Sequence, residues 1–309
     1  MTHIGVVLIV ALALGGLAFV CAFRWLERAI TFHPERLTAA EQKEPLPAGA
    51  EDVWFTAADG TRLHGWYFAR AESRNAGTII YFHGNGGNIR NVGWLAQSFA
   101  QRAFNVLLFD YRGYGLSDGK ATDESGLYLD GEAALQFVVS EKQKAPDRII
   151  LYGQSLGTAV ATETATRCTC GALILESGFS SASSLGSRVL PWVPRWLHFL
   201  GKNRFESARK LKTINMPVLV SHGDPDLTIP TDEGRALFAA ANEPKKLLIF
   251  PGAGHNVFGS AGAVYLDQLE EFIHAAVPPV PSSPAATRRE AKAAILDLQL
   301  LDDAELLRR

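Results

Sequence analysis

Short runs of consecutive apolar residues alternate with longer segments of helical composition through most of the chain. The runs predict buried strands over Thr78–Phe82, Asn105–Asp110, Ile149–Gly153, Ala172–Glu176, Val218–His222 and Leu247–Phe250. The longer segments predict helices over Asn91–Arg102, Gly126–Lys144, Thr158–Arg167, Asp232–Ala241 and Ala263–Ala276. Because strands that are apolar throughout are covered on both faces, the alternation predicts an α/β fold with a mostly parallel sheet.

Two segments depart from this rhythm. Val53–Thr56 and Arg62–Phe68 are strand-like and flank the turn Asp59-Gly60, which predicts a hairpin that leads into the sheet and brings it to eight strands. A long irregular insertion, residues 177–214, separates two of the later strands. We interpret it as a lid.

The N-terminal segment Ile4–Phe23 contains twenty residues and no charge. At about 1.5 Å per residue it matches a hydrocarbon core of roughly 30 Å. A cleaved signal peptide has a basic start, a shorter apolar core and a small-residue cleavage site, and none of these is present. The sequence therefore predicts a single-pass transmembrane anchor over residues 4–23. Arginines follow the span and no Lys or Arg precedes it, which favours a catalytic body on the cytoplasmic face.

The remaining boundaries follow from composition. Residues 24–50 are polar and contain three prolines, which predicts a tether between the anchor and a globular domain at 51–277. Residues 278–309 begin with a Pro-rich linker and end in a charged, Leu-rich tail. This tail is either a docked helix or a partly ordered appendage.

Charge and cysteine content exclude several classes of protein. The 309 residues carry a formal net charge of −2 with both signs interspersed, so we expect no nucleic-acid partner. Three cysteines are too few for a disulfide framework. Cys168 and Cys170 are too close for a typical bridge and lack the spaced partners of a zinc site, so we expect two small side chains at a helix end.

The pentapeptide Gly153–Gly157 matches G-x-S-x-G, with a predicted strand before it and a predicted helix after it. In this context the motif forms a nucleophile elbow, which exposes a serine hydroxyl above the sheet edge. Glycines are needed there because the tight turn leaves no room for Cβ atoms. Ser155 is the candidate nucleophile; the alternative is an ordinary strand–helix turn with an incidental serine.

A serine hydroxyl needs a general base, and the base needs an orienting carboxylate. His255 lies in a Gly-rich loop directly after the last predicted strand, and it is the candidate base. Asp224 and Asp226 both follow the preceding strand, so the residues alone leave two candidate acids. We expect His83 and His222 to have structural roles.

An oxyanion intermediate requires two oriented N–H donors. One is the backbone N–H of Leu156, directly after the candidate nucleophile. The other belongs to the glycine-rich loop Phe82–Gly87, where we favour the backbone of Asn85, with Gly86 as the alternative. The spacing of this loop fits neither of the common phosphate-binding patterns.

These motifs, in this order, resemble the α/β-hydrolase superfamily; they are His83–Gly87, Asp110–Ser117, Gly153–Gly157, His222–Asp226 and Gly254-His255. The chain looks most like the membrane-anchored α/β-hydrolase domain-containing branch, which includes depalmitoylases and lysophospholipases and is related to serine aminopeptidase-like hydrolases. The resemblance covers roughly Val53–Val277. It implies that Asp226 is the acid and that neither a metal ion nor an organic cofactor is needed. It leaves the substrate open.

Three aromatic residues are candidates for a substrate pocket. Trp192 and Trp196 lie in the insertion, where they would line an acyl pocket, touch the bilayer or simply pack. Tyr114 follows a strand near the expected site, and packing within its loop is the alternative.

The sequence thus predicts a membrane-anchored serine hydrolase of the esterase, lipase or thioesterase type. Its substrates would be carboxylic esters or thioesters, favouring lipids, acylated proteins or other acyl compounds. A peptidase or amidase with the same triad and a non-catalytic binding scaffold are the alternatives.

Overall fold

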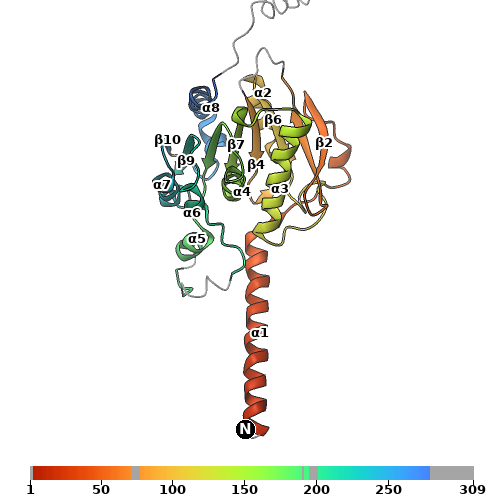
Figure 1. Cartoon of the computed structure of the whole chain (residues 1–309), viewed down its shortest axis with the longest axis vertical. Helices are drawn as coiled ribbons and strands as arrows, with labels where there is room; N and C mark the ends of the chain where they lie inside the picture. Colours follow the sequence, from red (N-terminus) through yellow and green to blue (C-terminus); the bar gives the residue numbers. More distant parts are fainter. Residues whose placement is uncertain (1–2, 71–76, 190, 195–200, 279–309) are drawn as a thin grey trace, which may run out of the picture.

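The computed structural model describes residues 3–70, 77–189, 191–194 and 201–278. A long helix, α1 (His3–Thr31), projects from a globular body (Figure 1). Among the described residues it is the one helix long and apolar enough to cross a membrane, over Ile9–Thr31, and none of the tested window is buried against the body.

The body is built on an eight-stranded sheet in the order β10-β9-β8-β7-β4-β6-β3-β2. Neighbours from β6 to β10 are parallel, whereas β3 is antiparallel to both β6 and β2. The predicted mixed α/β sheet is therefore confirmed. The strands are β2 (Ala50–Thr56), β3 (Arg62–Phe68), β4 (Thr78–Phe82), β6 (Asn105–Phe109), β7 (Ile149–Gln154), β8 (Ala172–Glu176), β9 (Val218–Asp224) and β10 (Lys245–Pro251).

Helices cover both faces of the sheet (Figure 1). One apolar core joins the sheet to α2 (Ile89–Gln101) and α8 (Val257–Ala276). The other joins it to α3 (Glu124–Gln136), α4 (Leu156–Ala165), α6 (Ser207–Leu211) and α7 (Thr231–Ala240). Alternate residues of β4 enter the two cores, which explains why its whole length is apolar.

Two helix boundaries differ from the prediction. The segment predicted as one helix to Lys144 changes to a π-helical turn at Phe137–Glu141. Helix α8 begins at Val257 rather than Ala263, because it continues across a kink at Gly262, where φ is 52°.

The segment after the apolar part of α1 is packed on the body, which corrects the expected tether over residues 24–50. Helix α1 continues to Thr31, and Phe32 and Leu37 are buried. Strand β1 (His33–Pro34) then pairs in parallel with β5 (Gly86–Gly87). The prediction relied on prolines and polar residues, whereas two apolar side chains and backbone pairing fix the segment.

The predicted lid at residues 177–214 contains α5 (Ala182–Val189) and α6, while residues 195–200 lie outside the described part of the chain. Phe205 in this insertion is buried against Phe32, Phe179 and Tyr128. The insertion is therefore anchored on both the body and the segment that follows α1.

The two neighbouring cysteines are joined, contrary to expectation. Cys168 and Cys170 form a disulfide, with their Cα atoms 5.6 Å apart. Spacing in the sequence argued against this bridge, but the turn after α4 brings the Cα atoms within the usual range for one. Cys21 remains a free, exposed thiol.

Candidate active site

Ser155 lies at the turn between β7 and α4, with φ 53° and ψ −118°. A Cβ atom on Gly153 would lie 2.4 Å from the carbonyl oxygen of Gly157, and one on Gly157 would lie 2.0 Å from that of Phe82. Neither approach is tolerable for a side chain, so both glycines are required by contact with backbone. The turn has the strained geometry that lifts a nucleophile off a sheet edge.

His255 and Asp226 are brought together from separate loops. Nδ1 of His255 lies 2.8 Å from Oδ2 of Asp226, whose side chain is fully buried. The other carboxylate oxygen accepts backbone N–H groups of Thr228 and Ile229, at 2.8 and 2.9 Å. Asp224, the other candidate acid, is exposed at the end of β9. The arrangement gives His255 the carboxylate partner that a general base needs.

His222 contacts the same carboxylate from inside the body. Its Nε2 lies 2.8 Å from the carbonyl oxygen of Ile229 and 3.2 Å from Oδ2 of Asp226. Burial alone would raise the pKa of Asp226, but hydrogen bonds from His222 and His255 hold it well below its usual value. Asp226 therefore remains ionised near neutral pH, and His222 has the structural position expected of it.

His255 is hydrogen-bonded to Asp226. Among the described residues, the Ser155 hydroxyl is not hydrogen-bonded to either of them. The contact between a serine nucleophile and its base is often long in enzymes without bound substrate, and it shortens in the substrate complex. Ser155, Asp226 and His255 all follow parallel strands, β7, β9 and β10, and so share one edge of the sheet.

The predicted oxyanion loop lies beside the nucleophile. A Cβ atom on Gly84 would be 3.5 Å from Cβ of Ser155. The next residue, Asn85, is clamped by its side chain: Oδ1 accepts the His33 backbone N–H at 3.1 Å, and Nδ2 lies 2.8 Å from Nδ1 of His33. The backbone N–H of Leu156 opens α4 directly after Ser155.

Tyr114 holds this loop, which agrees with packing within the loop, the alternative to a pocket role that the sequence left open. Its side chain is fully buried, and its hydroxyl donates to the Asn85 carbonyl oxygen at 2.9 Å. Burial raises the pKa of Tyr114, so the hydroxyl keeps its proton. Among the other pocket candidates, Trp192 is 77% exposed and Trp196 lies outside the described residues.

Sequence reasoning missed Glu176, the last residue of β8. It is fully buried; its Oε1 accepts the Phe258 N–H at 3.0 Å, and Tyr152 donates to Oε2 at 2.5 Å. Its carbonyl oxygen also accepts the Ser155 N–H at 2.9 Å. Glu176 therefore links the nucleophile turn to the start of α8, close after His255. Burial raises its pKa. The sequence did contain a signal for this role, namely a charged residue at the end of an otherwise apolar strand.

The chain is similar to several known proteins. Residues 73–210 match the family described as serine aminopeptidase, S33. An uncharacterized protein of Mycobacterium tuberculosis H37Rv is 36% identical over 270 residues, covering 87% of this chain and 94% of that protein. The mouse α/β-hydrolase domain-containing protein 17C is 33% identical over 231 residues, covering 74% of this chain and 69% of that protein.

A solved structure has the same fold. The Pyrococcus furiosus esterase Pf2001 superposes with a TM-score of 0.64 at 19% identity, covering 80% of this chain and 98% of that one. The sequence relatives together with this fold identify the family: the chain belongs to the α/β-hydrolase superfamily.

Proposed function

We propose that the protein is a membrane-anchored serine hydrolase that cleaves carboxylic esters or thioesters, with Ser155 as nucleophile, His255 as base and Asp226 as the acid that orients it. The observation that carries the proposal is the 2.8 Å contact between His255 and the buried Asp226. It lies at the sheet edge where Ser155 adopts the strained elbow geometry. The solved relatives of the same fold include esterases, which supports ester chemistry.

In this mechanism Oγ of Ser155 attacks the carbonyl carbon while Nε2 of His255 takes the hydroxyl proton. The backbone N–H groups of Leu156 and Asn85 stabilise the oxyanion that forms. The imidazolium returns the proton to the leaving alcohol or thiol, and the acyl group stays on Ser155. Water, deprotonated by His255, then attacks the acyl-enzyme, and the imidazolium returns the proton to Oγ of Ser155 as the carboxylic acid leaves.

The position of the anchor supports an acyl-chain substrate. Only Phe32 separates His33 from the end of α1, and His33 contacts Asn85. The oxyanion loop therefore lies at the end of the body that carries the anchor. A site close to the bilayer surface favours lipids or lipidated proteins over small polar esters.

Two features bear on the membrane face. Arg24, Arg28 and Arg36 follow the uncharged apolar run Ile4–Phe23, which supports a cytoplasmic body. The Cys168–Cys170 disulfide points to the opposite face, because disulfides persist mainly in oxidising compartments. We follow the arginines and propose the cytoplasmic face. The body should then resist protease added outside intact cells and be digested once the cells are opened; digestion in intact cells would place it on the other face.

The proposed chemistry is tested by replacing Ser155 with alanine in the full chain. Turnover of a series of nitrophenyl esters should fall by about 10⁶-fold, as when the nucleophile of a serine hydrolase is removed. Ser260→Ala, at an exposed position on α8, is the matched control and should leave turnover unchanged. Equal activity of the Ser155→Ala protein and the wild type would refute the proposal.

The matched serine aminopeptidase family favours a second candidate function, cleavage of aminoacyl amides by the same triad. Aminoacyl amides and esters with the same acyl group separate the two functions. We expect kcat/KM for esters to exceed that for amides, and the reverse order would favour the peptidase.

A further inference from the structure

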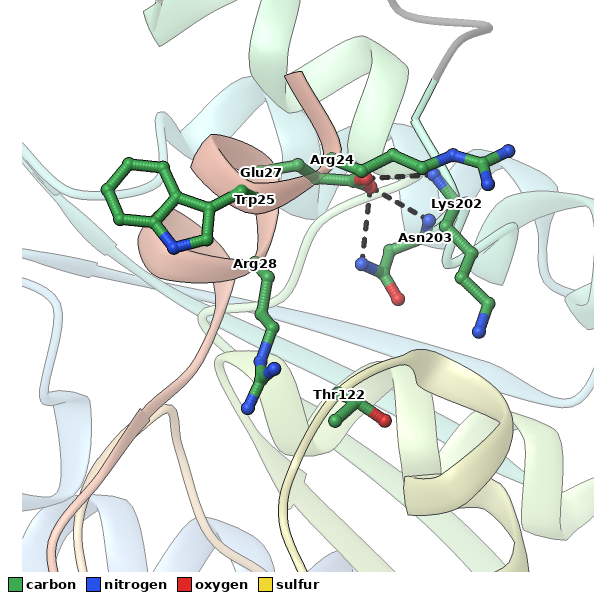
Figure 2. Close-up of a pocket in the computed structure, with 7 residues that line it drawn as sticks. All are labelled: Arg24, Trp25, Glu27, Arg28, Thr122, Lys202 and Asn203. Atoms are coloured by element: carbon green, nitrogen blue, oxygen red, sulfur yellow. Dashed lines mark hydrogen bonds between the residues drawn. The ribbon is translucent and has the colours of Figure 1, made fainter. Parts of the chain in front are cut away.

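A pocket of about 290 Å³ lies where α1 meets the body, and Figure 2 shows the residues that line it. They come from the end of α1, the loop before α3 and the insertion before α6: Arg24, Trp25, Glu27, Arg28, Thr122, Lys202 and Asn203. No residue of the proposed triad is among them, so this pocket is separate from the candidate active site.

Glu27 fixes the geometry of the pocket. Its carboxylate accepts the backbone N–H groups of Lys202 and Asn203 at 2.9 and 2.8 Å, and the Asn203 side-chain amide at 3.2 Å (Figure 2). Asn203 is itself only 6% exposed and accepts the Glu124 N–H through Oδ1 at 2.7 Å. One wall of the pocket is therefore held in place by hydrogen bonds between the anchor helix and the body.

The lining carries an excess of positive charge. Three of its side chains are basic and one, Glu27, is acidic. Lys202 pairs with Asp123 at 2.6 Å, and the ion pairs of the described residues include none for Arg24 or Arg28. In Figure 2 the Arg28 side chain extends from the helix toward Thr122, whereas the Arg24 side chain extends past Glu27 on the side of Lys202. The planar guanidinium is suited to two parallel hydrogen bonds to phosphate oxygens.

The pocket also has the right height for a lipid headgroup. Arg24 directly follows the apolar run that ends at Phe23, and Arg28 lies about 6 Å farther along the helix axis. Trp25, between them, is 71% exposed. Tryptophan at the end of an apolar span is typical of the membrane–water interface, where lipid phosphates lie.

We propose that this pocket binds the phosphate of an anionic glycerophospholipid, with Arg28 as the main cationic contact and Arg24 as a second cation on the Lys202 side of the pocket. The inference rests on the membrane anchoring in the proposed function, but not on its chemistry. A lipid bound there would join the anchor to the body and hold the nearby oxyanion loop at a fixed height above the bilayer.

The test uses the full chain with Ser155→Ala, so that no lipid is consumed. The protein is placed in nanodiscs of phosphatidylcholine with one-fifth phosphatidylglycerol and returned to detergent, and the retained lipids are measured by mass spectrometry. Arg24→Gln with Arg28→Gln should lower the enrichment of phosphatidylglycerol about 30-fold, at roughly 1 kcal/mol for each cation near the surface. Arg28→Lys should retain part of it. The matched control is Arg209→Gln, because Arg209 is a well-exposed cation on α6 away from the pocket.

Enrichment that is lost in the double variant and kept in the control supports the proposal. Equal enrichment in the double variant and the wild type overturns it. Displacement of the lipid by an equal concentration of soluble glycerol phosphate also overturns it, because the site would then bind the free anion. Ester turnover by the Ser155 protein is measured separately, so failure of lipid binding and failure of the hydrolase are distinguished.

Discussion

Two regions flank the candidate nucleophile, and they are held in place by different forces. The turn Gly153–Gly157 is fixed by steric contact of backbone with backbone, within the sheet itself. The oxyanion loop at Asn85 is fixed by His33 and Tyr114, which lie 52 and 29 residues away in the chain. Half of the site is therefore intrinsic to the sheet. The other half depends on the segment that follows α1, so we expect changes in this segment to affect the proposed catalysis.

The largest effect should come from the sterically fixed region. Gly157→Ala would place Cβ 2.0 Å from the Phe82 carbonyl oxygen, which only a shift of β4 could relieve. We expect a loss of more than about 4 kcal/mol in the free energy of unfolding, measured by urea denaturation. Gly86→Ala is the control, since a Cβ there has no heavy atom within 4 Å. Similar urea midpoints for the two variants would show that the turn has more freedom than this contact allows.

A smaller effect is expected at Glu176, which connects the nucleophile turn to α8. Glu176→Ala would leave the Phe258 N–H and the Tyr152 hydroxyl buried without this acceptor. At about 1–3 kcal/mol for a buried group left unpaired, the loss should be about 1–3 kcal/mol, because Tyr152 can still donate to the Tyr265 hydroxyl at 3.2 Å. Glu176→Gln keeps one carbonyl oxygen and should recover part of both stability and kcat. If Gln is no better than Ala, the carboxyl does not act through these hydrogen bonds.

The second region is tested by His33→Ala, which removes the ring nitrogen that lies 2.8 Å from the Asn85 side chain. Because His33 is exposed, we expect stability to change by less than about 0.5 kcal/mol. Looser positioning of the oxyanion donor should lower kcat about 10-fold, or about 1.4 kcal/mol, with little change in KM. Glu35→Ala, at an exposed neighbouring position, should leave kcat unchanged. Equal kcat values for both variants would mean that the segment only tethers the body.

The smallest effect concerns the Asp110–Ser117 loop, which contacts the second region through Tyr114. A hydrogen bond from Arg112 lowers the pKa of Asp59 to about 2. A depressed pKa contributes stability above the unfolded value of about 4, and this contribution is lost as the pH falls through 2. Since the Asp59 side chain is 37% exposed, solvent screening limits the contribution to under about 1 kcal/mol. Wild type and Asp59→Asn should differ at pH 6 and converge near pH 2; a constant difference would exclude the ion pair as its cause.

The sheet and the nucleophile turn could be predicted from the sequence because their signals are local. Apolar runs mark strands that are buried on both faces, and G-x-S-x-G between a strand and a helix has one common geometry. The choice between Asp224 and Asp226 was different. Both carboxylates follow the same strand, so the residues left the question open until the resemblance indicated Asp226.

The remaining features depend on contacts between distant parts of the chain. Phe32 and His33 are adjacent in a largely polar segment of the sequence, but they contact distant parts of the chain. Phe32 packs against the insertion, and His33 is hydrogen-bonded to the oxyanion loop. The structural role of Tyr114 and the network around Glu176 likewise require knowledge of which loops meet. The Cys168–Cys170 bridge depends on one turn of backbone, which spacing alone did not reveal.

The most direct test of the account is to find the residue that carries the acyl group. A fluorophosphonate reacts with an activated serine and stays attached, and peptide mass spectrometry identifies the labelled position. We predict a single adduct on Ser155 in the wild type, and labelling at least about 10³-fold slower in His255→Ala, where the base is absent. An adduct on any other serine, or equal rates in the two proteins, would contradict the proposed mechanism.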